Sequence, residues 1–542
     1  MKTIYKTLAA AALAMPMVFT GCIEETFPTS GVTSEQVAEN SKGLESVLRG
    51  MPAYMKKYQV WTSHAFDYGY PSVFCMLNVM TQDAFENATG YDWYSSWAEA
   101  SLNINTDKSP TQVVWYYLNF MVQSTNNVME TIGDNPSNSF TKGGLAQALI
   151  FRASTYLDMA RMYEFLPNDR ISSVNSAGND VLGLTVPIVT EKTSDEERQN
   201  NPRATHDQML EFILSDLDRA IDLYEDGGSA PSDKSFPSLA VAYGIKARAY
   251  MWDEDYPKAA EFAQLAIAAA GSATPLTKEQ WLDTTNGFND ASVSSWLWCI
   301  QQESNDDAVQ SWTNWTSFMA PEILIGYAGG GSGSGNTYFH IDKSLYESID
   351  NRDWRKLSFK APEGHPLSGQ EPTLSPARFA ELEEYAGVKF RPGKGNMNDE
   401  STAFATALPL MRIEEMYFIK AEATAHSNPS EGKRLIEEFM QTYRYKQYTC
   451  QASVLEDVVN EIILQKRMEF WGENITFFDF KRLNMSVDRA YDGSNWPDQE
   501  RLVSSGRPGW MNFCILDYEA EFNKGVKGYL NPNVGGVYKP VQ

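Results

Sequence analysis

The sequence predicts a mostly α-helical protein with long irregular loops, because apolar residues recur at helical spacing, helix-start motifs are frequent and loop-rich stretches separate the helices. Helices are expected near residues 34–57, 110–132 and 141–165. In the last of these, apolar residues such as Leu145 and Leu149 recur every three or four positions, which matches the 3.6-residue period of a helix. The chain is 43% hydrophobic and 13% aromatic, so it can bury a large core.

Two pairs of helices are expected to form antiparallel hairpins. Residues 239–252 and 257–270 carry small and aromatic residues at the spacing of a tetratricopeptide repeat, in which small side chains let two helices approach closely. A weaker hairpin is expected at 408–426 and 430–445. Because the hairpins are imperfect and interrupted, they predict a helical scaffold with insertions rather than a regular solenoid.

Capping boxes mark several helix starts, since a Ser or Thr and a Glu or Gln three residues later satisfy each other's free backbone amides. The candidate pairs are Thr205 with Gln208, Thr277 with Gln280, and Ser453 with Glu456. Irregular stretches are expected at 168–203, at the glycine-rich tract 329–335, at 361–377 and at 391–400. Long loops inside a compact protein are uncommon and often functional, so these loops are candidates to carry the ligand face.

The N-terminus predicts an export signal. Lys2 and Lys6 precede an apolar stretch from Leu8 to Phe19, which is too short to span a bilayer. The following Thr20-Gly21-Cys22 resembles a bacterial lipobox, with Phe19 where leucine is usual. We therefore expect residues 1–21 to be removed, Cys22 to be acylated and residues 22–33 to form a flexible leader. The alternative is an ordinary secretory signal with a cysteine there by chance.

Charge and cysteine content limit the function classes. The formal net charge of −25 opposes binding to nucleic acid, which depends on Lys and Arg releasing counterions from phosphates. Beyond Cys22, the cysteines are widely spaced and form no CxxC pair: Cys75, Cys299, Cys450 and Cys514. We interpret them as mostly buried thiols, although an exported protein also allows a disulfide that the sequence cannot assign.

The C-terminal third carries the most specific pattern. Residues 408–423 read Leu-Pro-Leu-Met-Arg-Ile-Glu-Glu-Met-Tyr-Phe-Ile-Lys-Ala-Glu-Ala, residues 462–473 read Ile-Ile-Leu-Gln-Lys-Arg-Met-Glu-Phe-Trp-Gly-Glu, and residues 477–482 read Phe-Phe-Asp-Phe-Lys-Arg. Together with residues 149–156 and the hairpin at 239–270, this order resembles the SusD/RagB family of outer-membrane glycan-binding lipoproteins. A departure is Gln465, where the family commonly has an acidic residue.

The resemblance implies a SusD-like helical fold with tetratricopeptide-like hairpins, in which an N-terminal part, 34–275, and a C-terminal part, 276–542, pack as one globular unit. It also implies a lipid-anchored protein at the outer membrane that faces the cell exterior, since Glu24-Glu25 looks like an acidic surface-export stretch. The implied function is to bind an oligosaccharide or polysaccharide and deliver it to a partner TonB-dependent outer-membrane transporter. No cofactor, metal or enzymatic activity is implied.

Two aromatic-rich segments are candidates to bind the glycan. Sugar rings stack their C–H faces on flat aromatic side chains, while neighbouring polar groups bond the hydroxyls. The first segment, 83–97, and the second, 296–315, contain the residues that we expect to contact ligand: Asn87, Tyr91, Trp93, Trp97, Trp296, Trp312 and Trp315. Any one of these rings is alternatively a core residue, since Trp and Tyr are more often buried than bound to ligand.

The C-terminal motif itself is expected to be structural. Arg467 with Glu469, and Asp479 with Arg482, are candidate charge pairs. They stand beside a bulky apolar set that suits a helix interface: Phe470, Trp471, Phe477, Phe478 and Phe480.

Two other function classes stay open at this point. A secreted glycoside hydrolase needs two carboxylates about 5–9.5 Å apart, which 70 acidic residues make easy to find without a specific motif. A surface protein that binds peptide or glycoconjugate suits the same scaffold. The five histidines form no HExxH pattern, and neither a GxSxG nor a GxxxxGK[ST] motif occurs.

Overall fold

The computed structural model describes residues 41–58, 61–330 and 336–541. The signal segment 1–21, the acylation site Cys22 and the leader 22–33 therefore lie outside the described residues. The described chain is mostly helical, with only four short strands, which confirms the predicted fold class.

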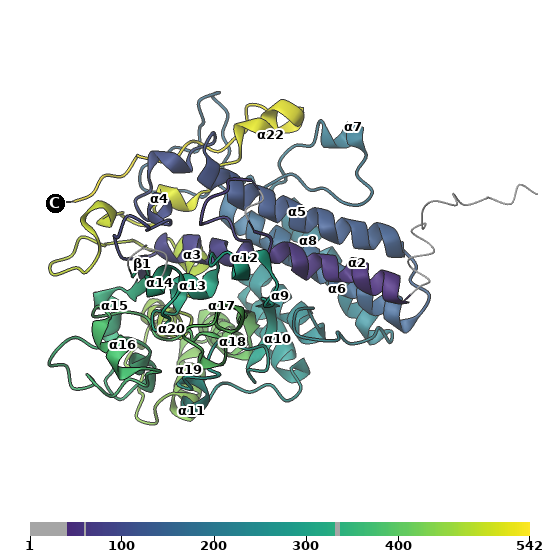
Figure 1. Cartoon of the computed structure of the whole chain (residues 1–542). Helices are drawn as coiled ribbons and strands as arrows, with labels where there is room; N and C mark the ends of the chain where they lie inside the picture. The colour runs from purple at the N-terminus through teal and green to yellow at the C-terminus, as the bar shows by residue number, and fades with distance from the viewer. Residues whose placement is uncertain (1–40, 59–60, 331–335, 542) are drawn as a thin grey trace, which may run out of the picture.

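Long helices form a continuous scaffold in which each packs against the next along the chain (Figure 1). Their order of packing is α2 (Ser41–Met55), α5 (Ser109–Ile132), α6 (Ser139–Tyr163), α8 (His206–Glu225), α9 (Leu239–Trp252), α10 (Tyr256–Ala269), α18 (Ile413–Ser427), and then both α19 (Pro429–Tyr443) and α20 (Leu455–Glu469). The expected hairpin of α9 and α10 is present, and α10 also packs on α18. This contact joins helices more than 140 residues apart in sequence.

Shorter elements fill the loops that the scaffold holds. They are α3 (Tyr70–Val79), α4 (Ser95–Ala98), α7 (Asp195–Arg198), α11 (Lys278–Trp281), α12 (Asp307–Gln310), α13 (Trp315–Met319), α14 (Gly326–Gly329), α15 (Lys343–Ser348), α16 (Pro376–Glu381), α17 (Glu400–Ala403), α21 (Ile475–Arg482) and α22 (Asp517–Phe522). Turns of 3₁₀ helix lie at 102–104, 354–358, 393–395, 498–500, 509–511 and 524–526.

Two antiparallel strand pairs bring distant loops together. β1 (Ala84–Glu86) pairs with β3 (Phe339–Ile341), and β2 (Trp296–Gln301) pairs with β4 (Ala407–Arg412). The prediction that helix begins at 408 was wrong for the first residues, which form β4. Pro409 lacks the amide hydrogen that a helix interior needs, and this stretch is buried on β2 instead.

Helix starts were predicted well where the cap is local. Thr205 and Thr277 each accept a bond from the backbone amide three residues later, and both capping boxes are complete. The third box was wrong: α20 begins after Val454, and no side chain caps it. Ser453 lies one position too early for its hydroxyl to reach the first turn.

Most of the core is a large cluster of buried side chains that extends from Leu44 to Tyr538, and two smaller clusters lie at 418–470 and 309–404. All five aromatic residues of the C-terminal motif are at most 8% exposed, which confirms their structural role. Cys75, Cys299, Cys450 and Cys514 are buried free thiols, and the described part of the chain contains no disulfide. Also within the described residues, no helix has the length and apolar character required to cross a membrane.

A charged centre lies inside this core around Glu469, which is fully buried. The Glu469 carboxylate accepts hydrogen bonds from three guanidinium groups, at 2.5 and 2.7 Å from Arg444, 3.0 Å from Arg355 and 3.3 Å from Arg412. Burial alone would raise the pKa of Glu469, but these arginines overcome burial and hold the pKa well below its usual range. The predicted Arg467–Glu469 pair was wrong, because residues two apart point to different sides of a helix.

The second predicted pair is confirmed, since Arg482 bonds Asp479 at 2.8 Å. Arg467 turns instead to Asp83, at 2.7 Å, and so ties α20 to the segment before β1. Gln465, the departure from the family pattern, accepts a bond from Arg355 at 2.6 Å and thus joins the charged centre through its neutral amide.

Candidate functional site

Aromatic side chains from two loops and from helix α14 lie near one another. We call the group His64, Tyr91, Trp93 and Tyr327 the aromatic patch. The Trp93 ring centre lies 6.1 Å from that of His64, and Tyr91 lies 6.4 Å from Tyr327. Tyr91 is 41% exposed, His64 is exposed, and Trp93 and Tyr327 are half-buried, so solvent reaches the rings of this group. Such a surface suits stacking against a flat, partly apolar ligand.

Tyr327 connects the patch to the α12–α14 region. Its ring stacks on Phe318, with 4.5 Å between ring centres. Burial raises the pKa of Tyr327, while the side chains of Thr313 and Trp93, both close to its hydroxyl, oppose that rise. Trp93 thus lies close to a residue more than 230 positions later in the chain.

Hydrogen bonds hold the turn that presents Tyr91 and Trp93 in place. Asp92 accepts a bond from the backbone amide of Gly90 at 2.8 Å, and Glu86 accepts one from the backbone amide of Tyr94 at 3.1 Å. The Tyr94 hydroxyl donates to that of the buried Tyr68. These bonds pre-organise the turn, which lowers the entropy cost of binding a ligand.

Asn87 and three of the candidate tryptophans are buried in this structure. The exposed fractions are 9% for Asn87, 2% for Trp97, 1% for Trp296 and 2% for Trp315. Asn87 uses its amide to bind backbone groups of Asn336 and Tyr338, which fastens the turn to β3. A ring that is fully packed presents no face to a sugar, so in this conformation these four residues support the site from within.

Trp312 differs from its buried neighbours because it is half-exposed. Its φ of 63° lies in the left-handed region, which costs a non-glycine residue about 1–2 kcal/mol. The indole nitrogen donates a hydrogen bond to Glu400, the first residue of α17. An unfavourable backbone held by a specific bond is common where a side chain must be presented in one orientation.

Two buried carboxyl groups lie near the turn. Glu86 and Glu500 are each 2% exposed, and each has one oxygen without a hydrogen-bond partner. Burial raises the pKa of Glu500 to about 8; Arg489 opposes that rise and Glu99 and Asp92 add to it. Burial also raises the pKa of Glu86, so burial favours the neutral form of both groups.

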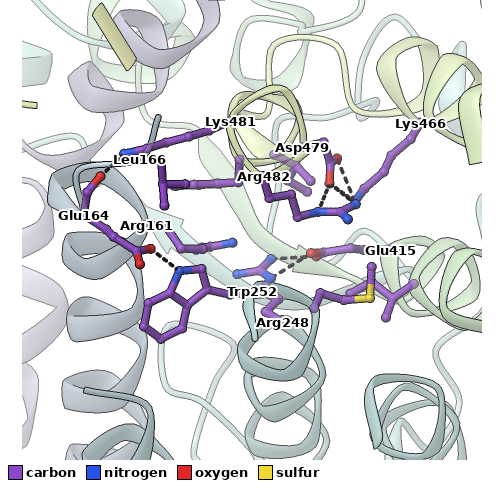
Figure 2. A pocket seen from close by; sticks show the side chains of 14 residues that line it. Arg161, Glu164, Leu166, Arg248, Trp252, Glu415, Lys466, Asp479, Lys481 and Arg482 are labelled. Carbon is purple, nitrogen blue, oxygen red and sulfur yellow. Dashed lines mark hydrogen bonds and ion pairs between the residues drawn. The ribbon is translucent and has the colours of Figure 1, made fainter. Parts of the chain in front are cut away.

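Charged residues line two small internal cavities between the halves of the scaffold, and Figure 2 shows the first of them. The cavities measure about 40 and 30 Å³, enough for a few waters but not for a sugar ring. Figure 2 shows most of the charges paired across them: Arg248 bonds Glu415 at 2.6 and 2.7 Å, and Lys466 and Arg482 both bond Asp479. These cavities belong to the fold rather than to a glycan site.

Two protein-family profiles match this chain. The profile of a family described as "Starch-binding associating with outer membrane" matches residues 37–251, and the SusD family profile matches residues 327–532. The chain belongs to the SusD/RagB family. The resemblance seen in the sequence is thereby confirmed over both parts of the described chain.

Solved structures of SusD-like proteins share the fold. A SusD-like carbohydrate binding protein from Bacteroides vulgatus is 19% identical, with a TM-score of 0.68 over 91% of this chain and 98% of that one. A SusD superfamily protein from Bacteroides thetaiotaomicron is 17% identical, with a TM-score of 0.65 over 91% of this chain and all of the other. A SusD-like carbohydrate binding protein from Bacteroides fragilis is 15% identical, with a TM-score of 0.63 and coverages of 91% and 100%. No curated protein gave a significant match.

For this SusD/RagB protein, sequence reasoning found Tyr91 and Trp93 but missed His64 and Tyr327. Tyr327 directly precedes the glycine-rich tract, and its position there was the available signal. His64 was considered only as a metal ligand. Among the described residues, no group of three or more His, Cys, Asp or Glu side chains is placed to hold a metal ion.

Proposed function

We propose that this protein is a cell-surface glycan-binding lipoprotein that captures an oligosaccharide or polysaccharide and delivers it to a TonB-dependent outer-membrane transporter. Membership of a family described as starch-binding and associated with the outer membrane supports the ligand class and the location. The observation that carries the proposal is the aromatic patch, where solvent reaches rings from separate segments of the chain. The ring centres of His64 and Trp93 are 6.1 Å apart, and those of Tyr91 and Tyr327 are 6.4 Å apart.

In this proposal Tyr91, Trp93 and Trp312 stack against sugar rings, and Tyr327 and His64 border them. Asn87, Trp97, Trp296 and Trp315 act behind these residues, where they position the turn and α13. Stacking on aromatic faces is tolerant of which hydroxyls a sugar carries, so the patch supplies affinity, and polar neighbours supply selectivity.

Acylated Cys22 holds the body to the outer membrane in this proposal, and the leader 22–33 lets it move over the transporter mouth. Multiple acyl chains on one residue anchor far more firmly than one chain, because each buried methylene contributes about 0.8 kcal/mol. Cys22→Ala should abolish membrane retention of the exported protein while leaving glycan binding in solution unchanged.

The test begins with a glycan-array screen of the protein that lacks residues 1–22, followed by calorimetry with each glycan that binds. Tyr91→Ala, Trp93→Ala and Trp312→Ala are each expected to weaken binding about tenfold, since a stacked ring contributes about 1 kcal/mol or more. Phe522→Ala is the matched control, because Phe522 is 70% exposed on α22, outside the aromatic patch.

Unchanged affinity in the variants of Tyr91, Trp93 and Trp312 would place the glycan elsewhere on the protein. Overnight incubation of the bound glycan with the protein tests the absence of catalysis. Chain shortening with turnover would show a hydrolase and contradict a role limited to binding.

A further inference from the structure

A second pocket, of about 430 Å³, opens beside the strand pair β2–β4. Its size lies within the roughly 300–1,000 Å³ range of ligand sites. Four segments form its walls: 286–290 before β2, 301–304 after β2, the turn 393–394, and 401–405 at the end of α17 and before β4. We call this the amide pocket, because four Asn and Gln residues line it together with Ser and Thr residues: Asn286, Asn289, Gln301 and Gln302.

The walls are held by backbone contacts, so the pocket is preformed. The Asn289 carbonyl accepts a bond from the Ala407 amide at 2.9 Å, and the Asn289 side chain donates to Pro392 at 2.8 Å. Gly393 lies so close to α17 that a Cβ there would stand 2.1 Å from the Thr402 carbonyl oxygen. Only glycine fits at this position, which indicates that the turn and α17 keep a fixed spacing.

Gln302 is the decisive residue. It is 0% exposed, it lines the amide pocket, and neither its Nε2 nor its Oε1 has a hydrogen-bond partner within the chain. Its backbone is held by a 2.9 Å bond to the Thr406 carbonyl, so the side chain has a fixed origin at the end of β2. Leaving both ends of a buried amide unpaired costs about 1–3 kcal/mol, unless water or a ligand supplies the missing partners.

The lining chemistry selects the ligand class. An amide offers a donor and an acceptor side by side, and a hydroxyl group offers both as well, so amides and sugar hydroxyls are complementary. The charged lining residues are Asp290, Glu303 and Lys394, which gives the pocket one more negative than positive group. A carboxylate or phosphate ligand would meet net repulsion there, and the absence of aromatic lining disfavours an apolar one.

We propose that the amide pocket binds one sugar residue of an uncharged glycan through its hydroxyls, as a subsite separate from the aromatic patch. This inference rests on the proposed glycan-binding function. Helix α17 connects the pocket to Trp312, a proposed stacking residue, since its Glu400 bonds Trp312 while Ser401 and Thr402 line the pocket. A glycan chain long enough to reach both sites makes its second contact at a high effective concentration once the first has formed. Affinity should therefore rise with the length of the glycan.

The experiment measures calorimetric affinity for short and long neutral oligosaccharides built from glucose, galactose, mannose or xylose, with oligogalacturonate as the acidic probe. Gln302→Met replaces the amide with an apolar group of similar shape, and Asn286→Ala alters the exposed rim. Each is expected to weaken neutral-glycan binding about tenfold. Gln123→Met, the same chemical change at an exposed position on α5, is the control and should bind like wild type.

The melting temperature separates the binding role of Gln302 from a merely structural one. Replacing an unpaired buried amide with an apolar group is neutral or stabilising, so Gln302→Met should melt at or above the wild-type temperature. If Gln302→Met fails to fold, Asn286→Ala, on the exposed rim, decides the affinity question alone.

Each remaining outcome is decisive. If Trp93→Ala weakens neutral-glycan binding while both pocket variants bind like wild type, the inference is overturned and the proposed function stands. Binding of oligogalacturonate in place of every neutral glycan overturns the uncharged class assigned to the pocket. If wild type binds no glycan at all, the proposed function fails, and the inference fails with it.

Discussion

The charged centre around Glu469 and the loops that carry the amide pocket treat buried polar groups in opposite ways. At the centre, both Glu469 oxygens receive guanidinium donors, and the arginines come from separate parts of the C-terminal half. In the pocket, the equally buried Gln302 has no partner at either end of its amide. The chain itself thus satisfies the Glu469 carboxylate, whereas it leaves both ends of the Gln302 amide unpaired where a pocket opens.

The largest effect is expected from breaking the centre. Glu469→Ala leaves Arg355, Arg412 and Arg444 buried without their shared partner, which should lower the free energy of unfolding by about 3–5 kcal/mol. Denaturant unfolding followed by circular dichroism measures this loss. Glu469→Gln keeps the shape and one acceptor, so it should fall between the alanine variant and wild type. An alanine variant as stable as wild type would mean that the arginines find other partners.

Two tryptophans three residues apart allow a buried ring that stabilises the fold to be compared with a half-exposed ring that is proposed to bind glycan. Trp315 packs edge-on against Phe74 and Phe390, with ring centres at 5.9 and 5.2 Å, so Trp315→Ala should cost about 3–5 kcal/mol of stability. Trp312→Ala removes a half-exposed ring and should cost roughly 1 kcal/mol. Glycan affinity, measured on the folded fraction, should show the opposite order. Trp312→Ala should lose more affinity than Trp315→Ala. Equal stability losses in Trp312→Ala and Trp315→Ala would show that the two rings contribute alike to the fold.

Next in size is a pH effect at Glu500. Its folded-state pKa of about 8 exceeds that of an exposed Glu near 4.5, so the folded protein keeps a proton that the unfolded chain releases. Stability should therefore fall as pH rises from about 5 to 8 and level off above that. Glu500→Gln should remove part of this slope and stabilise the protein at pH 8–9 by about 1 kcal/mol or more.

Melting curves of wild type and Glu500→Gln across this pH range provide the measurement. Burial also raises the pKa of Glu86, so the single variant keeps a residual slope of the same sign. Parallel curves for the two proteins would show that Glu500 is ionised in the folded state at neutral pH.

The smallest effect is expected at the surface. Arg434 bonds Glu431 and Glu438 at 2.7–2.8 Å, but all three side chains are at least 38% exposed. Arg434→Ala should change the free energy of unfolding far less than the core variants do, because exposed ion pairs are screened by solvent. Added salt should shrink even that difference, whereas the loss in Glu469→Ala should be nearly insensitive to salt.

The helical scaffold was predictable because its signals are local. The hairpin of α9 and α10 follows from residue spacing alone, and the boxes at Thr205 and Thr277 involve residues three apart. The strand pair β2–β4 was not predictable, since its partners lie about 110 residues apart and both strands are buried on each face. Such strands show no alternation of polar and apolar residues.

The candidate site was predictable only in part. The turn with Tyr91 and Trp93 was found from its aromatic content, but composition does not distinguish Trp312 from the buried Trp315. Which ring reaches solvent depends on a positive φ at Trp312 and on the bond to Glu400, 88 positions later. Gln302 lies inside the second predicted segment, 296–315, but the sequence did not single it out, because an unpaired amide is a property of the surrounding segments and not of the residue.

The four buried thiols provide built-in reporters of local opening. Burial raises the pKa of Cys299 and Cys514 to about 12, and raises the pKa of Cys75 and Cys450 as well. Alkylation requires an exposed thiolate, so each site reacts only when its surroundings transiently unfold. The sites lie in α3, in β2, between α19 and α20, and after the 509–511 turn. The order in which the four cysteines are alkylated would rank the free energy of local unfolding of the region around each one.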